Sequence, residues 1–170
     1  MKQVMKVLIW IIVIGGICTG VYMVLPDYPQ DFIKSFVQPV INSQAKARIK
    51  QVQSLKAEGV DNVDYKTVLE KNTGISCWVY ETRESEPGVE YVKYRGKGAA
   101  MNLKEYTDYD GKLSTSCLVT FEFKIKGSSV EIYPYIDDVK MNIEDGAHVD
   151  ANKKIREDIV QQLYNGMKAD

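Results

Sequence analysis

The sequence contains little of the chemistry on which most enzymes depend. Its 170 residues include one histidine and three cysteines. The histidine, His148, stands without the nucleophile motif that Ser–His or Cys–His catalysis requires. Zinc sites take several Cys and His ligands at set spacings, and the sequence has no such spacing. We therefore predict a protein that is not an enzyme and that holds no metal and no cofactor.

Phosphate, calcium and nucleic-acid sites are disfavoured as well. Gly96 to Gly98 flank a lysine but lack the rest of a phosphate-binding loop. The net charge of −1 gives no basic excess of the kind that nucleic-acid-binding domains show, so we expect no nucleic-acid partner. An acidic group near the C-terminal third misses the EF-hand spacing and predicts a solvated edge: Asp137, Asp138, Glu144, Asp145 and Asp150.

One long uncharged run is present near the N-terminus. Residues 7–25 read VLIWIIVIGGICTGVYMVL and contain no charged side chain. At 1.5 Å per residue this run spans about 28 Å as a helix, close to the ~30 Å of bilayer hydrocarbon. Lysines precede it and aspartates follow it, so the positive-inside rule predicts three parts. These are a cytoplasmic N-terminus at 1–6, a transmembrane signal anchor at 7–25, and an extracytoplasmic remainder.

The same run permits two further interpretations. Cys18, Thr19 and Gly20 place small residues at a cleavage position near Gly20, and cleavage there would release a secreted soluble domain. Apolar residues continue to Leu25, which favours the uncleaved anchor. Gly16 and Gly20 stand four residues apart, a spacing that lets two membrane helices pack closely. Self-association through this face is one hypothesis, and chance spacing is the alternative.

Residues 26–60 predict kinked amphipathic juxtamembrane helices, because apolar residues recur there at helical spacing. Pro39 is expected to kink or restart the first helix near Gln38, and Gly59 to end the second. The second helix has basic residues whose role is open between contact with anionic lipid and, the favoured interpretation, the solvated face of a docked helix: Lys46, Arg48 and Lys50.

Residues 61–170 predict an extracytoplasmic α+β domain. A short helix capped by Asp61 comes first, an antiparallel β-meander of about four to five strands follows, and an amphipathic helix capped by Asp150 closes the chain. We expect turns at Glu86–Gly88, Asp110–Gly111 and Gly127–Ser129, and a weak separate strand at 99–106. Because each strand has one polar face, helices are expected on one side of the sheet only. The strongest strand alternates Cys117, Val119, Phe121, Phe123 and Ile125 with polar residues.

Two groups of residues in this domain are candidates for a role beyond packing. Cys77 and Cys117 both fall on apolar strand positions, so a disulfide is one hypothesis and two separate buried thiols the other. Aromatic residues are concentrated in the strand region, where β propensity alone explains many of them. A partner-binding surface is the alternative for four of these aromatic residues: Trp78, Tyr80, Tyr133 and Tyr135.

The whole layout, one anchor followed by helices and a curved antiparallel sheet, is broadly similar to that of bitopic assembly proteins of type IV secretion systems. Their outer domain is NTF2-like. The similarity lies in the layout, and no motif in the sequence identifies a family. We predict a single-pass protein of the cell membrane that displays an interaction or assembly module in the cell envelope. Its predicted partners are the lipid bilayer and an envelope protein or a second copy. The alternative is an NTF2-like domain that binds a small ligand in an apolar pocket.

Overall fold

A computed structural model describes residues 27–102, 113–137, 139–140 and 149–166 of the chain. The predicted segments 1–6 and 7–25 therefore lie outside the described residues, together with Gly16, Gly20 and His148. Within the described ranges, no helix combines the length and the apolar character needed to cross a membrane.

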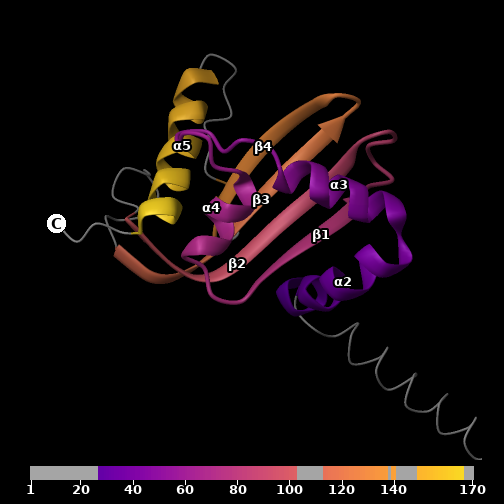
Figure 1. The fold of residues 1–170 in the computed structure, drawn as a ribbon, viewed down its shortest axis with the longest axis horizontal. Helices are drawn as coiled ribbons and strands as arrows, with labels where there is room; N and C mark the ends of the chain where they lie inside the picture. The colour runs from indigo at the N-terminus through magenta and orange to yellow at the C-terminus, as the bar shows by residue number, and fades with distance from the viewer. Residues whose placement is uncertain (1–26, 103–112, 138, 141–148, 167–170) are drawn as a thin grey trace, which may run out of the picture.

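The described part has the predicted α+β architecture (Figure 1). Three helices precede an antiparallel sheet in which every strand pairs with its neighbours in sequence, in the order β1-β2-β3-β4-β5. A fourth described helix closes the chain. The elements are α2 (Asp27–Ile41), α3 (Ser43–Gln53), α4 (Tyr65–Lys71), β1 (Ser76–Thr82), β2 (Glu90–Asn102), β3 (Leu113–Lys126), β4 (Ser129–Ile136), β5 (Val139–Lys140) and α5 (Val149–Asn165).

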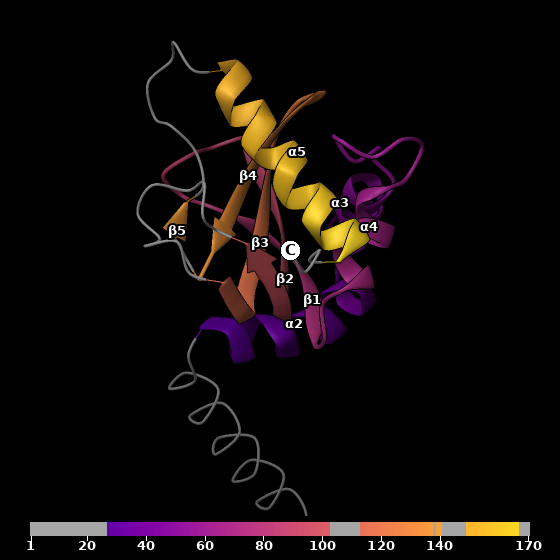
Figure 2. The ribbon, with the colours of Figure 1, turned by 90° about the vertical axis from the view of Figure 1, so that its left-hand side faces the viewer.

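The core lies between one face of the sheet and helices α3, α4 and α5 (Figure 2). We call this the inner face. The apolar alternation predicted for the strongest strand is confirmed, because its five apolar side chains are all fully buried there. Helix α5 contributes Ile159, Val160 and Leu163, and α3 contributes Ala45, Ile49 and Val52. Helix α3 is thus docked on the domain, and its Arg48 pairs with Glu90 at 2.5 Å.

Helix α2 lies along strand β1, which has no strand partner on that side among the described residues. Near its start, the Tyr28 hydroxyl donates a hydrogen bond to the carbonyl of Ile75 at 2.7 Å. Near its end, the Gln38 amide donates to the Tyr80 carbonyl at 2.7 Å and accepts from the Tyr80 N–H at 3.0 Å. The two Gln38 bonds occupy backbone groups of Tyr80 that an exposed edge strand would otherwise offer to another chain. The Ile75 carbonyl, just before β1, also accepts from the N–H of Lys97 in β2 at 3.0 Å.

Several predicted boundaries are wrong by a few residues. Helix α2 continues through Pro39, and the break comes at Asn42, whose side chain caps α3 by accepting from the N–H of Ala45 at 3.0 Å. Helix α3 ends at Gln53, well before Gly59. At the first boundary the Asn42 cap, rather than the proline, marks where one helix ends and the next begins.

Helix α4 is also capped by a different aspartate from the one predicted. Asp64, not Asp61, accepts a hydrogen bond from the N–H of Thr67 at 2.8 Å. The separate strand predicted at 99–106 is wrong over its described part, because residues 99–102 continue β2 after a register shift. The turns at Glu86–Gly88 and Gly127–Ser129 join β1 to β2 and β3 to β4, as predicted, whereas the Asp110–Gly111 turn lies outside the described residues.

Candidate functional site

The sheet face opposite the core carries a regular array of polar side chains, and we call it the outer face. Strand register sets its residues in three rows that cross β1, β2, β3 and β4 in turn. Rows of this kind bring side chains within reach of one another because directly opposed residues on antiparallel strands lie close together. The rows are Cys77–Arg95–Thr120–Tyr135, Val79–Lys93–Glu122–Tyr133 and Glu81–Tyr91–Lys124–Glu131.

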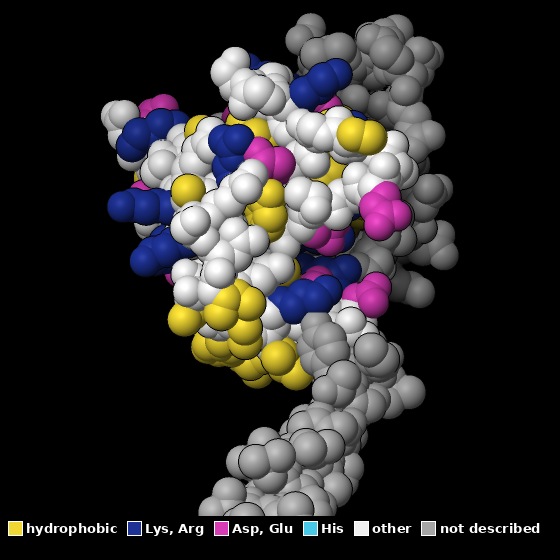
Figure 3. All heavy atoms as spheres, turned by 90° about the vertical axis from the view of Figure 1, so that its right-hand side faces the viewer, with side chains coloured by type: hydrophobic (Ala, Val, Ile, Leu, Met, Phe, Trp, Pro, Cys, Tyr) yellow, Lys and Arg dark blue, Asp and Glu magenta, His cyan; other side chains and the backbone are white. Residues whose placement is uncertain are grey.

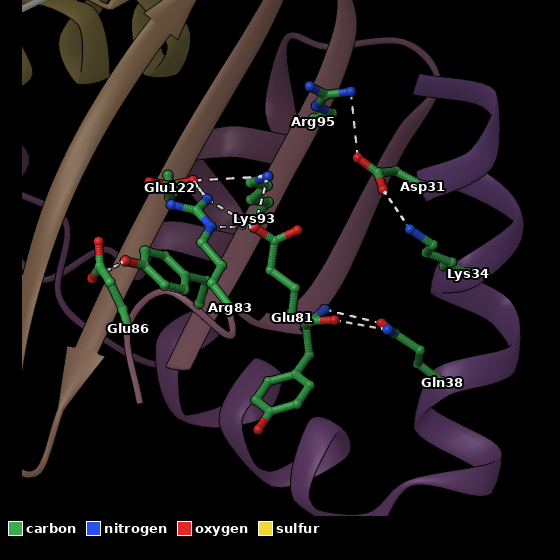
Figure 4. A network of polar contacts seen from close by, with 11 residues as sticks. Asp31, Lys34, Gln38, Glu81, Arg83, Glu86, Lys93, Arg95 and Glu122 are labelled. Carbon is green, nitrogen blue, oxygen red and sulfur yellow. Dashed lines mark hydrogen bonds and ion pairs between the residues drawn. The ribbon is translucent and has the colours of Figure 1, made fainter. Parts of the chain in front are cut away.

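A network of ion pairs joins the middle row to the third (Figure 4). The Lys93 ammonium lies 2.9 Å from the Glu81 carboxylate and 3.8 Å from that of Glu122. Arg83, from the loop after β1, pairs with Glu81 at 2.8 Å and also with Glu122. Two cations and two carboxylates from three strands and the β1–β2 loop therefore alternate, and their formal charges cancel.

Arg83 also covers an aromatic ring. Its guanidinium lies over Tyr91, 3.7 Å from the ring centroid, and Tyr91 is almost fully buried. The Tyr91 hydroxyl donates to Glu86 at 2.5 Å, and the Lys124 ammonium lies 2.8 Å from the same carboxylate. A planar guanidinium that stacks on a ring and bonds to carboxylates is held in one orientation. The β1–β2 loop is thereby fixed to the outer face.

The electrostatics favour the ionised form of Glu81. Burial raises the pKa of this carboxyl, but hydrogen bonds from Lys93 and Arg83 outweigh burial and bring the pKa below its ordinary value. Burial also lowers the pKa of Arg83, and its bonds to Glu81 and Glu122 more than reverse that effect. General acid catalysis at neutral pH needs a carboxyl whose pKa is raised, and Glu81 shows the opposite shift. Its ion pairs with Lys93 and Arg83 favour a structural carboxylate that stays ionised at neutral pH.

A second group of ion pairs connects α2 to the outer face. Asp31 of α2 lies 3.3 Å from the Arg95 guanidinium and 3.7 Å from the Lys34 ammonium (Figure 4). Asp31 is only 7% exposed, and burial raises its pKa although Arg95 opposes the shift. An ion pair with Arg95, in the first row of the outer face, therefore helps to hold α2 in position.

Two of the four predicted surface aromatics lie on the outer face. Tyr133 and Tyr135 are part-exposed residues of β4, the strand at the far side of the four-strand rows. The Tyr133 hydroxyl donates to Glu131 at 2.7 Å, and this bond, with burial, raises its pKa to about 12. Burial likewise raises the pKa of Tyr135. Both phenols thus remain protonated at neutral pH and present a ring and a hydroxyl group.

The other two predicted surface aromatics, Trp78 and Tyr80, are in the core instead. Each is 7% exposed and belongs to the inner face. The Trp78 ring centroid lies 4.9 Å from that of Tyr94, and its indole N–H donates to Glu70 at 2.8 Å. The prediction failed because apolar residues occupy both faces of β1, and the larger rings fill the space under the helices.

Of the two hypotheses for the cysteines, the structure has two separate buried thiols. Cys77 and Cys117 are both buried and do not form a disulfide. Cys77 belongs to the first row of the outer face, whereas Cys117 packs among the core residues of the inner face. Side chains on opposite faces of one sheet point away from each other, so a bond between them would require a different register.

Two open depressions flank the β1–β2 hairpin. One, of about 300 Å³, lies between this hairpin and the β3–β4 hairpin, and the other, of about 560 Å³, extends from it towards the start of α3. Charged and polar side chains dominate both linings. Over the described part of the chain, no cluster of three His, Cys, Asp or Glu residues is arranged to hold a metal ion.

The fold and the outer face thus define an α+β domain with a charge-paired sheet surface. Comparison of the chain with protein-family models, with curated proteins and with solved structures finds no match. Sequence reasoning missed Arg83 and Asp31 as parts of this surface. The polar alternation of β3 did indicate Glu122 and Lys124, but partners from a loop and a helix follow only from the three-dimensional arrangement.

Proposed function

We propose that this protein is a single-pass membrane-anchored module that displays its α+β domain outside the cytoplasm and binds an envelope protein through the outer face. The observation that carries this proposal is the outer face itself, where ordered charges and two part-exposed tyrosines share one surface. The uncharged segment 7–25, with lysines before it and aspartates after it, supports the anchor and the orientation.

The side chains of this surface are of the kinds that protein interfaces use. Tyrosine and arginine are enriched at binding surfaces, and charges arranged in advance give specificity for a complementary partner. Arg83, Glu81 and Lys93 already hold one another in place, so little side-chain freedom remains to be lost on binding. A partner with its own alternating charges fits this pattern best.

The packing of the inner face supports an interaction module over a small-ligand pocket. Aromatic rings occupy the space between the sheet and the helices, where an NTF2-like pocket would need room. The Tyr65 and Trp78 centroids lie 5.1 Å and 6.0 Å from that of Phe123. Rings packed this closely leave a filled layer at the centre of the inner face.

Photocrosslinking in intact membranes tests the partner surface. The full-length protein would carry a photoreactive phenylalanine analogue in place of Tyr133 or Tyr135, and adducts would be identified by mass spectrometry. Lys66, an exposed residue of α4, serves as the matched control position because α4 packs on the inner face. We expect the same partner at both tyrosine positions and not at Lys66. Recovery of monomer alone, or of equal adducts at all three positions, contradicts the proposal.

A reporter fused after Asp170 tests the topology separately. A reporter that is active only outside the cytoplasm should be active in this fusion and should stay with the membrane fraction. Activity confined to a cytoplasmic reporter contradicts the orientation. Release of the active reporter into the soluble fraction assigns segment 7–25 to a cleaved signal peptide instead of an anchor.

A further inference from the structure

Helix α2 presents an apolar stripe to the outside of the domain. Its large hydrophobic side chains recur at i, i+3, i+4, i+7 and i+8, the spacing of one helical face. We call this stripe the apolar face of α2. Figure 3 shows hydrophobic side chains gathered over α2 at one end of the molecule, with Lys and Arg side chains nearby. The stripe consists of Ile33 (43% exposed), Phe36 (65%), Val37 (47%), Val40 (83%) and Ile41 (75%).

The opposite side of the same helix holds the domain through polar groups. Gln38 bonds to the backbone of Tyr80 in β1, Tyr28 bonds to the carbonyl of Ile75 just before β1, and Asp31 pairs with Arg95. A surface helix of a water-soluble domain normally turns its apolar stripe inward. In α2 the arrangement is reversed: polar contacts attach the helix to the sheet, and the apolar face is left for another environment.

We propose that the apolar face of α2 lies in the lipid interface of the same membrane that holds the anchor. This inference rests on the proposed anchor at residues 7–25. The sequence carries the argument: the uncharged run ends at Leu25, and α2 begins at Asp27, so only Pro26 separates them. A helix joined this closely to a spanning segment starts at the headgroup level. Lying flat, it places its stripe against the acyl boundary, as interfacial amphipathic helices do.

The residue beside the apolar face of α2 also fits a location at the lipid interface. Lys34 is part-exposed beside Asp31, and a lysine at the edge of an interfacial helix extends its ammonium towards phosphate groups. Because α2 runs along β1, the sheet stands on its β1 edge over the bilayer, with β5 farthest away. The outer face then points sideways, where a neighbouring envelope protein has access to it.

The experiment measures lipid contact directly at Val40, the most exposed residue of the stripe. An environment-sensitive fluorescent amino acid replaces Val40 in the full-length protein, reconstituted in vesicles of phosphatidylcholine and phosphatidylglycerol. Lys66 on α4 is the matched control. Lipids brominated near the headgroup end of the acyl chain act as quenchers. We expect blue-shifted, quenched emission at position 40 and water-like, unquenched emission at position 66.

Three other outcomes overturn the inference, and flotation of the same vesicles shows which of them is a failure of the anchor. A protein that floats with the vesicles but has water-like emission at position 40 keeps the anchor and loses the lipid contact. Blue-shifted emission without lipid quenching, together with a Val40→Cys crosslink between two copies, assigns the apolar face to a dimer. A protein that does not float contradicts the anchor and the lipid contact together.

Discussion

The side-chain amide of Gln38 bonds to both the N–H and the carbonyl of Tyr80, so one glutamine supplies the edge strand with the pair of bonds that a neighbouring strand would make. Through this contact α2 belongs to the folded domain although its stripe faces outward. The same contact gives a direct way to weaken the attachment of α2 without touching the core.

Replacing Gln38 should loosen α2 and destabilise the domain. Gln38→Ala removes two hydrogen bonds and leaves the backbone groups of Tyr80 without their partner, which should lower the free energy of unfolding by about 1–3 kcal/mol. Gln38→Glu is the sharper variant, because a carboxylate still accepts from the N–H but cannot donate to the carbonyl. Hydrogen exchange at the Tyr80 amide should therefore rise in Gln38→Ala more than in Gln38→Glu. Equal exchange in wild type and both variants contradicts the bonding scheme.

Two glycines with the same backbone angle form a matched pair. Gly59 and Gly88 both have φ of +80°, but a Cβ at Gly59 would meet the Cβ of Glu157 at 2.9 Å, whereas nothing lies within 4 Å of one at Gly88. Gly88→Ala should therefore show only the backbone penalty, roughly 1–2 kcal/mol. Gly59→Ala adds a clash with α5 and should lose about 1–3 kcal/mol more. Chemical denaturation measures both, and equal losses would contradict the close approach of α5 to Gly59.

The ion pairs of the outer face should be energetically coupled. Arg83→Ala leaves the buried Glu122 carboxylate with a more distant partner, the Lys93 ammonium at 3.8 Å. Adding Glu122→Gln should then restore part of the lost stability, because the unpaired charge is gone. A double-mutant cycle should give a coupling of about 0.5–3 kcal/mol. Additive effects of the two substitutions would contradict the pairing.

The pH dependence of stability should respond in opposite directions at Glu81 and Asp31. The pKa of Glu81 is lowered in the fold, so its contribution is present above the unfolded pKa of about 4.3 and is lost as pH falls through the folded value. The pKa of Asp31 is raised, so its contribution is present below about 3.9 and is lost as pH rises through the folded value.

Removing each carboxyl separates the two effects. In denaturation series between neutral and acidic pH, Glu81→Gln should make the acid loss of stability shallower, and Asp31→Asn should make it steeper. The sign of each change is the test, since both variants are expected to fold. A steeper loss in Glu81→Gln would show that Lys93 and Arg83 do not hold the ionised carboxylate in solution.

The native cysteines should react slowly with thiol reagents while the domain is folded. Cys77 is buried, and burial raises the pKa of its thiol to about 11, so little thiolate is present at neutral pH. Alkylation followed by mass spectrometry should show modification of Cys77 and Cys117 only after denaturation. Modification that needs prior reduction would mean that a disulfide forms and would contradict their placement on opposite faces.

The sequence was most informative where the alternation of apolar and polar residues was compatible with only one orientation of a strand. The β3 alternation ending at Ile125 places apolar residues on one face and charged residues on the other, and only one register buries the apolar set. In β1 the odd-numbered and the even-numbered positions both carry apolar residues, so the alternation could not decide whether Cys77 or Trp78 faces the core. Ring packing against Tyr94 and Phe123, which come from other strands, decides it in the fold.

Local signals were weaker where two residues could play the same role. Asp61 and Asp64 are both good helix caps, and Asp64 is used because its carboxylate reaches the N–H of Thr67. The outer face was harder still. Arg83 and Glu122 are 39 positions apart, and their contact depends on the hairpin, the register and the loop conformation at once. No local pattern contains that information.

The two attachments of α2 to β1 also have a mechanical consequence. Tyr28 bonds to the carbonyl of Ile75, just before β1, and Gln38 bonds to Tyr80 within β1, so the contacts are five residues apart along the chain instead of being concentrated at one point. A force applied along the axis of α2 loads both contacts together. Bonds loaded together resist more force than bonds opened one after another. In the proposed anchored arrangement, a force transmitted from a bound partner would therefore be shared by both contacts of α2.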